Sequence, residues 1–117
     1  MKRPIPSCLL LVWLLIASCA PGSGGTAGQD AELARQSLIQ FTEYLHEGKY
    51  DDAARLYGGT YEVMISHNED IDPEDRIALW LRACTINGAQ CLRVRSATMQ
   101  EQISPTEYVF LVEFEYD

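Results

Sequence analysis

The residue with the clearest chemical context in this sequence is Cys19. Lys2 and Arg3 stand near the start of the chain, and a short apolar run follows at residues 8–16. Small residues then precede the cysteine. A basic start, a short apolar core and small residues at its end are the parts of a secretory signal peptide. The apolar run is about half the roughly 20 residues that a membrane-spanning helix needs. We therefore expect export, and not a transmembrane anchor.

The segment Ile16-Ala17-Ser18-Cys19 resembles the lipobox of bacterial lipoproteins, which is an aliphatic residue, two small residues and a cysteine. The resemblance implies that residues 1–18 are a signal peptide and that the Cys19 thiol is lipidated. Cys19 then becomes the new amino terminus, itself open to acylation. Two or three acyl chains hold a protein firmly on a membrane, whereas one myristoyl chain binds only reversibly. The expected location is the cell envelope, lipid-anchored on the extracytoplasmic side of a bacterial membrane. Ordinary secretion is the alternative.

Two further cysteines, Cys84 and Cys91, are separated by a short loop. An exported domain meets oxidising conditions, where such a pair favours a structural disulfide. The chain-entropy estimate for closing so short a loop is about 2.5 kcal/mol. A redox-active pair is usually closer, as Cys-x-x-Cys, and a metal site would lack ligands because both histidines are distant in sequence. We predict a structural disulfide between the two.

The most acidic stretch of the chain raises the question of calcium binding. An EF-hand loop that starts at Asn68 would need Gly at its sixth position and Glu at its twelfth, where the chain has Pro73 and Leu79. The stretch instead predicts a helix start, with Asp72 as N-cap, Pro73 at the first helical position and Asp75 completing a capping-box-like pattern. We predict no metal and no cofactor.

Acid or base catalysis has few candidate side chains in this sequence. A catalytic acid or base needs an apolar setting and a partner. His46 lies at a helix end, where the helix dipole favours its cation, and none of the candidates stands beside a clear partner. We therefore predict no catalytic residue, with an enzyme as the alternative. The candidates are His46, Tyr44, Tyr57 and Tyr61.

The predicted organisation has three parts, at residues 1–18, 19–29 and 30–117. After the signal peptide, residues 19–29 comprise the lipidated cysteine and a flexible tether rich in Gly and Ser. The first helix of the folded part is predicted from Asp30 to Glu47, with Gly48 as a left-handed C-cap. Its apolar face follows the helical period and consists of Ala34, Leu38, Phe41 and Leu45.

Two more helices are predicted before the strands. The second runs from Tyr50 to Tyr57, with its alanines and tyrosines toward the first helix, and residues 61–66 form a helical turn or a loop. The third runs from Pro73 to about Thr85. We interpret Trp80 as a core residue, with a place in a ligand pocket as the alternative. The predicted apolar stripe of the third helix is Ile77, Trp80, Leu81 and Cys84.

From Leu92 onward the sequence alternates with a period of two, which predicts a β-hairpin. A change of parity predicts a bulge near Gln100. A turn at 104–107 leads into a second strand with one apolar face, made of Tyr108, Phe110, Val112, Phe114 and Tyr116.

A long helix followed by Gly48-Lys49-Tyr50-Asp51-Asp52-Ala53-Ala54-Arg55-Leu56-Tyr57 resembles the opening of NTF2-like (cystatin-like α+β) domains. The resemblance covers about residues 31–117, its motif is loose, and other helical hairpins share it. It implies an α+β fold in which two to three helices pack on an antiparallel hairpin or small curved sheet. Such domains have further strands where this chain reaches Asp117. We expect either a C-terminally truncated chain, which we favour, or a strand edge that pairs with another chain.

These patterns favour a non-catalytic, lipid-anchored binding or accessory domain. The alternatives are an NTF2-like enzyme of the isomerase or dehydratase type and a structural envelope protein. The net charge of −8 argues against nucleic acid as a partner. The expected partners are the membrane, through the lipid anchor, and an unknown protein or small ligand. Self-association through the last strand's edge is a further expectation.

Overall fold

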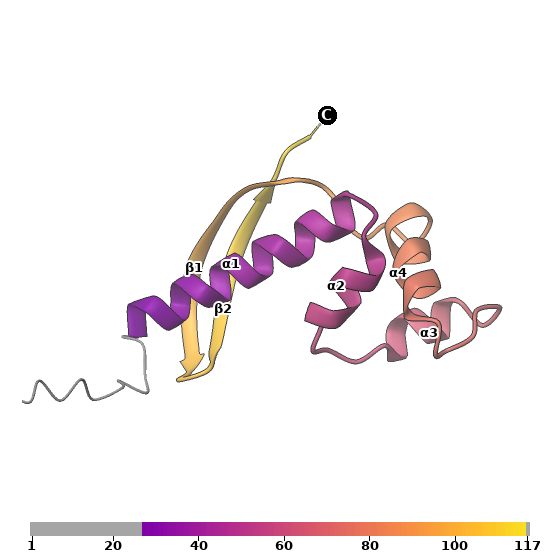
Figure 1. Ribbon diagram of the computed structural model, residues 1–117, viewed down its shortest axis with the longest axis horizontal. Coiled ribbons are helices and arrows are strands. Elements are labelled where there is room, and N and C mark those ends of the chain that lie inside the picture. Colours follow the sequence, from indigo (N-terminus) through magenta and orange to yellow (C-terminus); the bar gives the residue numbers. More distant parts are fainter. Residues whose placement is uncertain (1–26, 117) are drawn as a thin grey trace, which may run out of the picture.

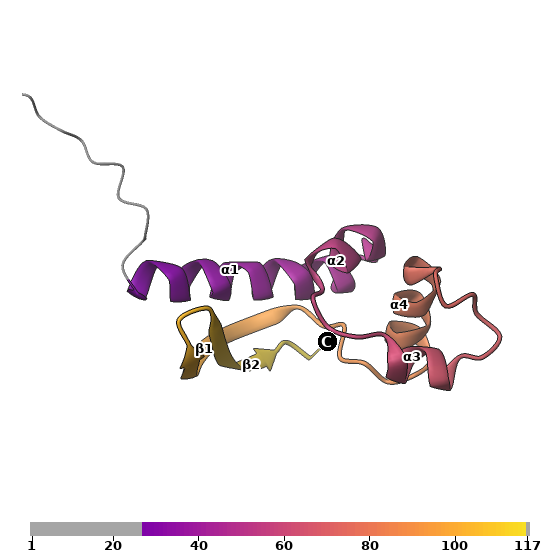
Figure 2. The same ribbon diagram turned by 90° about the horizontal axis from the view of Figure 1, so that it is seen from below.

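The computed structural model describes residues 27–116, so Cys19, the predicted signal peptide and most of the predicted tether lie outside the described residues. The described chain has four helices followed by two antiparallel strands. α1 lies across one face of the hairpin, and the three shorter helices lie near the C-terminal end of α1 (Figure 1, Figure 2). The elements are α1 (Ala27–His46), α2 (Tyr50–Leu56), α3 (Glu62–His67), α4 (Arg76–Thr85), β1 (Val94–Ser104) and β2 (Glu107–Phe114).

The predicted α+β class is confirmed, with more helices than the two to three expected. The additional helix is α3, which lies where the sequence predicted a helical turn or a loop. None of the described helices is both long and apolar enough to cross a membrane.

α1 is longer than its sequence pattern predicted. It begins at Ala27, so residues 27–29 of the predicted tether are helical. Ala and Gln are good helix formers, and this extension leaves Asp30 in the first turn, where the helix dipole favours an acid. At the other end Gly48 has a φ of 75°, and the Lys49 N–H donates to the Tyr44 carbonyl oxygen at 2.8 Å. The predicted glycine C-cap is confirmed.

The core lies where α1, α2 and α4 meet. Ala53 of α2 has no exposed surface and packs with Leu45 of α1 and Trp80 of α4. A small side chain at this position lets the helices approach closely. The Trp80 ring stands edge-on to Phe41 and Tyr57, with ring centroids 5.4 and 5.0 Å away. Both the predicted contact of α2 with α1 and the core position of Trp80 are confirmed.

The start of α4 differs from the prediction. The N-cap is Asp75, whose Oδ1 accepts a hydrogen bond from the Ala78 N–H at 3.0 Å. Asp72 instead accepts from the Glu74 N–H at 2.9 Å, within a turn that the Asp75 N–H closes onto the Asp72 carbonyl. The predictions of Asp72 as N-cap and of Pro73 as the first helical residue were therefore wrong. Residues 72–75 form this turn, so the helix begins only after Asp75.

The buried face of α4 also differs from the predicted stripe. Leu79, Trp80 and Ala83 are buried, whereas Ile77 and Leu81 are about half exposed, at 49% and 47%. The two stripes are neighbours on the helix, and both are apolar. The pattern therefore identified an amphipathic helix but could not determine which side faces the core.

β2 confirms the predicted alternation, and β1 contains the predicted bulge. The alternation predicted from Leu92 onward is wrong for β1, which begins at Val94 and is exposed throughout residues 98–103. Tyr108, Phe110, Val112 and Phe114 are half-buried, and the residues between them are exposed. The pairing shifts between Met99 and Glu101, as expected near Gln100, and also at Arg95 and Ile103. The shift at Arg95 brings Ala97 to the buried side. Among the described residues no further strand pairs with this hairpin, and Tyr116 is 83% exposed rather than part of the apolar face.

Candidate ligand-binding site

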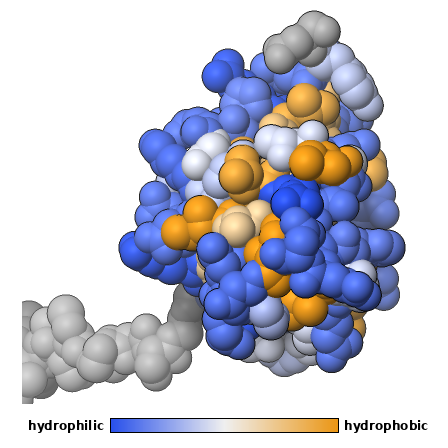
Figure 3. Space-filling view, turned by 90° about the vertical axis from the view of Figure 1, so that its right-hand side faces the viewer, coloured by the Kyte–Doolittle hydropathy of each residue, from blue (hydrophilic) through white to orange (hydrophobic). Residues whose placement is uncertain are grey.

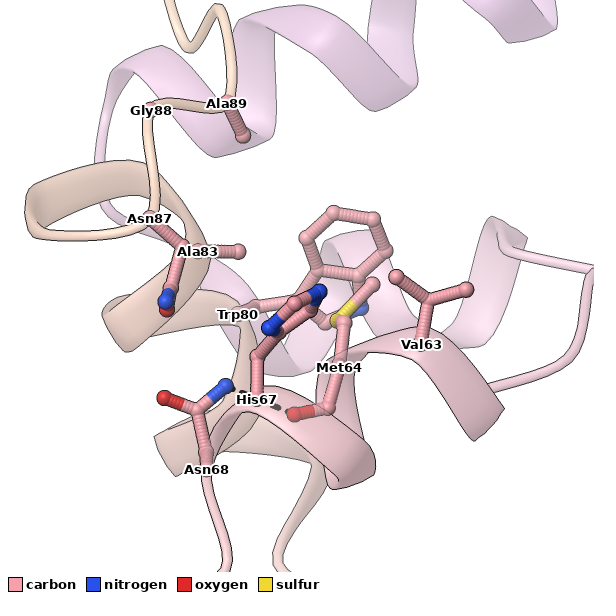
Figure 4. A pocket seen from close by; sticks show the side chains of 9 residues that line it. All are labelled: Val63, Met64, His67, Asn68, Trp80, Ala83, Asn87, Gly88 and Ala89. Carbon is pink, nitrogen blue, oxygen red and sulfur yellow. Dashed lines mark hydrogen bonds between the residues drawn. The ribbon is translucent and has the colours of Figure 1, made fainter.

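A cavity of about 350 Å³ lies between α3, α4 and the loop that follows α4. Figure 3 shows this end of the molecule, where apolar residues are grouped among hydrophilic ones. Most of the wall is apolar, and three polar side chains, from His67, Asn68 and Asn87, complete it (Figure 4). The full lining comprises Val63, Met64, His67, Asn68, Trp80, Ala83, Asn87, Gly88 and Ala89.

The loop wall of the cavity is fixed to α4 at two points. Gly88 has a φ of 79°, a left-handed backbone conformation that glycine adopts readily. The chain turns back there, and the Ala89 N–H donates to the Ala83 carbonyl at 3.0 Å. Just beyond, the sulfur atoms of Cys84 and Cys91 lie 1.99 Å apart, at disulfide distance. The predicted cysteine pair is thus brought together, and it closes the loop that carries Asn87 to Ala89.

The Trp80 ring is held in place by its indole nitrogen. Nε1 donates to the Tyr61 hydroxyl at 3.1 Å, and the Arg76 guanidinium lies 4.1 Å from the centre of the Tyr61 ring. Figure 4 shows the Trp80 ring beside Met64 and Val63, where it forms the apolar back of the cavity. The site therefore presents a preformed aromatic surface.

Asn68 sits at the end of α3 and is only 3% exposed. Its Nδ2 donates to the Met64 carbonyl at 2.6 Å, while its Oδ1 is buried with no hydrogen-bond partner in the described chain. Leaving a buried acceptor unsatisfied typically costs about 1–3 kcal/mol. In Figure 4 the amide extends from the cavity floor, with Nδ2 toward Met64 and Oδ1 turned away from it.

The loop after Asn68 is tied to α4 by an ion pair. Arg82 donates to both carboxylate oxygens of Asp70, at 3.0 and 3.5 Å. This hydrogen bonding holds the pKa of the Asp70 carboxyl below its ordinary value. The pair thereby fixes one side of the segment that leads from the cavity to α4.

Of the four side chains considered for catalysis, Tyr57 and Tyr61 stand edge to face with ring centroids 5.1 Å apart, but each hydroxyl is engaged in a structural hydrogen bond. His46 Nδ1 lies 3.2 Å from the Cys91 carbonyl oxygen, and the Tyr57 hydroxyl donates to the Thr60 carbonyl at 3.0 Å. Tyr44 lies beneath Lys49, whose Nζ is 5.9 Å from the ring centre. Tyr61 is engaged by Trp80, and none of the four lines the cavity. Across residues 27–116, no group of three or more His, Cys, Asp or Glu side chains is placed to hold a metal ion.

Of the residues that line this cavity, sequence reasoning considered only Trp80 for a ligand pocket, and it preferred a core role. Trp80 is both buried in the core and part of the cavity wall. His67, Asn68, Asn87 and Ala89 were not identified as site residues. They come from α3 and from a loop far along the chain, so no local pattern joins them. Comparisons with protein-family models, with characterised proteins and with solved structures give no match.

Proposed function

We propose that this chain is a bacterial lipoprotein whose folded part is a non-catalytic binding or accessory domain on the extracytoplasmic side of the membrane. The cavity between α3 and α4 is its ligand site, and it takes a small apolar or aromatic molecule. The anchor rests on the lipobox-like segment at 16–19. A cysteine pair at disulfide distance supports an oxidising compartment. A long helix, then a short one, over an antiparallel hairpin supports an NTF2-like relationship.

The observation that carries the binding role is the aromatic back wall of the cavity. Trp80 is fixed there by its hydrogen bond to Tyr61 before any ligand arrives. Ligand pockets typically have volumes of about 300–1,000 Å³, with mostly apolar walls and a few polar groups. This cavity, at about 350 Å³, is at the lower end of that range. It suits a single ring or a short branched chain.

The anchor is tested by Cys19→Ser. We expect the variant to keep its signal segment and to move from the membrane fraction to the soluble fraction, because it has no thiol to lipidate. Cys8→Ser is the matched control, since Cys8 lies at the start of the apolar run and does not follow the small residues. Membrane association that is unchanged in Cys19→Ser would remove the lipoprotein assignment.

The binding role is tested by titrating the full chain with p-xylene and following the methyl signals of Val63 and Met64 by NMR. We expect saturable shifts of both. Ala89→Trp, at the cavity wall, should abolish them, whereas Gln90→Trp, next to it but outside the lining, should leave them unchanged. No saturable shift in the unmodified chain, or equal shifts in Ala89→Trp, would contradict the assignment of the cavity as the ligand site.

A further inference from the structure

One polar side chain of the α3–α4 cavity differs from the other two in its access to water. Asn68 is only 3% exposed, whereas His67 and Asn87 are exposed. An exposed amide or imidazole keeps its hydrogen bonds to water, so a ligand that meets it only exchanges one partner for another. A buried side-chain oxygen has no water to exchange. The polar selectivity of the cavity therefore depends mainly on Asn68.

The orientation of the Asn68 amide is determined by its neighbour. A backbone carbonyl oxygen only accepts hydrogen bonds, so the amide atom that lies 2.6 Å from the Met64 carbonyl oxygen must be Nδ2. The other end of the amide, Oδ1, is an acceptor, and no group of the described chain donates to it. The cavity wall therefore contains an unused acceptor rather than an unused donor.

The backbone of Asn68 is also held, which limits how far its side chain can turn to find a donor. The Asn68 N–H donates to the Ile65 carbonyl at 3.1 Å, and the Asn68 carbonyl accepts from the Ile71 N–H at 3.0 Å. These bonds join Asn68 to α3 and to the loop that follows. The acceptor is thus fixed before a ligand binds, and a fixed group loses little conformational freedom on binding.

The apolar and amide side chains occupy different parts of the cavity wall. In Figure 4 the Trp80 ring lies beside Met64 and Val63, and the amides of Asn68 and Asn87 lie on the other side of the drawing. All five residues line the cavity. A ligand that spans this space would be apolar at the Trp80 end and polar at the amide end.

We propose that the cavity takes a small aromatic or apolar molecule with one neutral O–H or N–H donor, and that this donor binds Asn68 Oδ1. This ligand class rests on the proposed role of the cavity as the ligand site. The apolar part packs against Trp80. Oδ1 has almost no surface open to water, so the exposed side chain of the neighbouring His67 gives way as the donor enters. Because Oδ1 loses no water, the hydrogen bond forms without a desolvation cost on the protein side.

The test compares three ligands of similar size on the full chain. p-Cresol has a hydroxyl group where p-xylene has a methyl group and 4-fluorotoluene has a fluorine, and only the hydroxyl donates. Titrations followed by the methyl signals of Val63 and Met64 measure the three affinities. We expect p-cresol to bind about fivefold more tightly than either of the others, or better, because it satisfies the buried acceptor.

The outcomes separate this ligand class from the role of the cavity. Equal affinities, or weaker binding of p-cresol, would overturn the proposed donor and leave the cavity as a ligand site. No saturable shift with any of the three ligands would contradict the cavity as a ligand site and, with it, the ligand class. Because this comparison uses the unmodified chain, it does not depend on the folding of a variant.

Two variants identify the group that accepts from the ligand. Asn68→Leu keeps the approximate size of the side chain and removes Oδ1, so p-cresol should lose its preference. His67→Ala alters the wall for all three ligands alike, so the preference should persist. Retention of the hydrogen-bonded fold in both variants is checked by NMR. A preference that survives in a folded Asn68→Leu, or that disappears in His67→Ala, would assign the donor to another partner and overturn the proposal.

Discussion

The ion pair between Asp70 and Arg82 should make the stability of the fold depend on pH. Because the pKa of Asp70 is lowered in the folded chain, the pair stabilises the fold above the ordinary Asp pKa of about 3.9 and is lost as the pH falls through the lowered value. We expect Asp70→Asn to decrease Tm slightly at about pH 7, and the difference from the unmodified chain to shrink as the pH falls below the ordinary Asp pKa of about 3.9.

Thermal unfolding followed by circular dichroism across this pH range measures the effect. Glu69→Gln is the matched control, because Glu69 is the neighbouring exposed acid and forms no ion pair in the described chain. A Tm difference for Asp70→Asn that is constant with pH would show that the change acts through something other than its charge.

The N-cap of α4 gives a second residue-scale prediction. Asp75 accepts from the Ala78 N–H, so Asp75→Ala should decrease the free energy of unfolding by about 1 kcal/mol, and Asp75→Asn by a few tenths at most, since Asn also caps well. Urea unfolding of both variants measures this. An equal loss in the two variants would show that the carboxylate charge matters more than the cap.

Some of the residues that fix these local structures could be predicted from the sequence, and others could not. Gly48 and the pairing of Cys84 with Cys91 were predicted, because each depends on local chemistry. Asp75 was assigned a secondary role behind Asp72, since two aspartates three positions apart both fit an N-cap. Only the turn that joins them decides between the two.

Among the elements, the close contact between α1 and α2 depends on one small side chain. Ala53 has no exposed surface. Ala53→Leu must therefore displace α1 or force a strained side chain, which typically costs about 1–3 kcal/mol in the free energy of unfolding. Leu56→Ala, on the exposed side of the same helix, should change it by less than about 1 kcal/mol. Urea unfolding compares the two, and a smaller cost for Ala53→Leu would show that the interface is loose.

The cysteine pair joins the end of α4 to the segment before β1. We expect alkylation and peptide mapping to show both thiols blocked until a reductant is added. Replacing both by Ala should decrease the free energy of unfolding by about 2.5 kcal/mol, the chain-entropy estimate for so short a loop. Cys84 and Cys91 that both alkylate fully in the air-oxidised chain would contradict a disulfide.

Periodicity predicted where helices and strands occur, but not how each is turned. The alternation from Tyr108 to Phe114 is strict because one face lies under α1, and it was predicted correctly. In α4 two adjacent apolar stripes compete, and Leu79, the fully buried one, lay outside the predicted stripe. The cavity was not predicted, since it exists only where α3 and the loop at Asn87 meet across the tertiary structure.

For the whole molecule, no strand of the described residues pairs with the outer edge of β2, which raises the question of whether two copies pair there. The edge is regular and apolar on its inner side, which favours pairing between copies. The glutamates at 107, 113 and 115 oppose it through like-charge repulsion. Salt shortens the range of that repulsion from about 10 Å at 0.1 M to about 3 Å at 1 M, without affecting backbone hydrogen bonds to the same extent.

We therefore predict that the chain is monomeric at about 0.1 M salt and self-associates at about 1 M, where the repulsion is screened. Size-exclusion chromatography with light scattering on Cys19→Ser, which lacks the thiol for a lipid anchor, measures the mass at both salt concentrations. The Glu115 N–H donates to the Arg93 carbonyl on the β1 side, and because bonding direction alternates along a strand, the Val112 N–H points away from β1. Val112→Pro in the same background should stay monomeric at both, because proline removes this N–H. Self-association of Val112→Pro at high salt would place the contact elsewhere, and a Cys19→Ser chain that is monomeric throughout would show that this edge does not pair with itself.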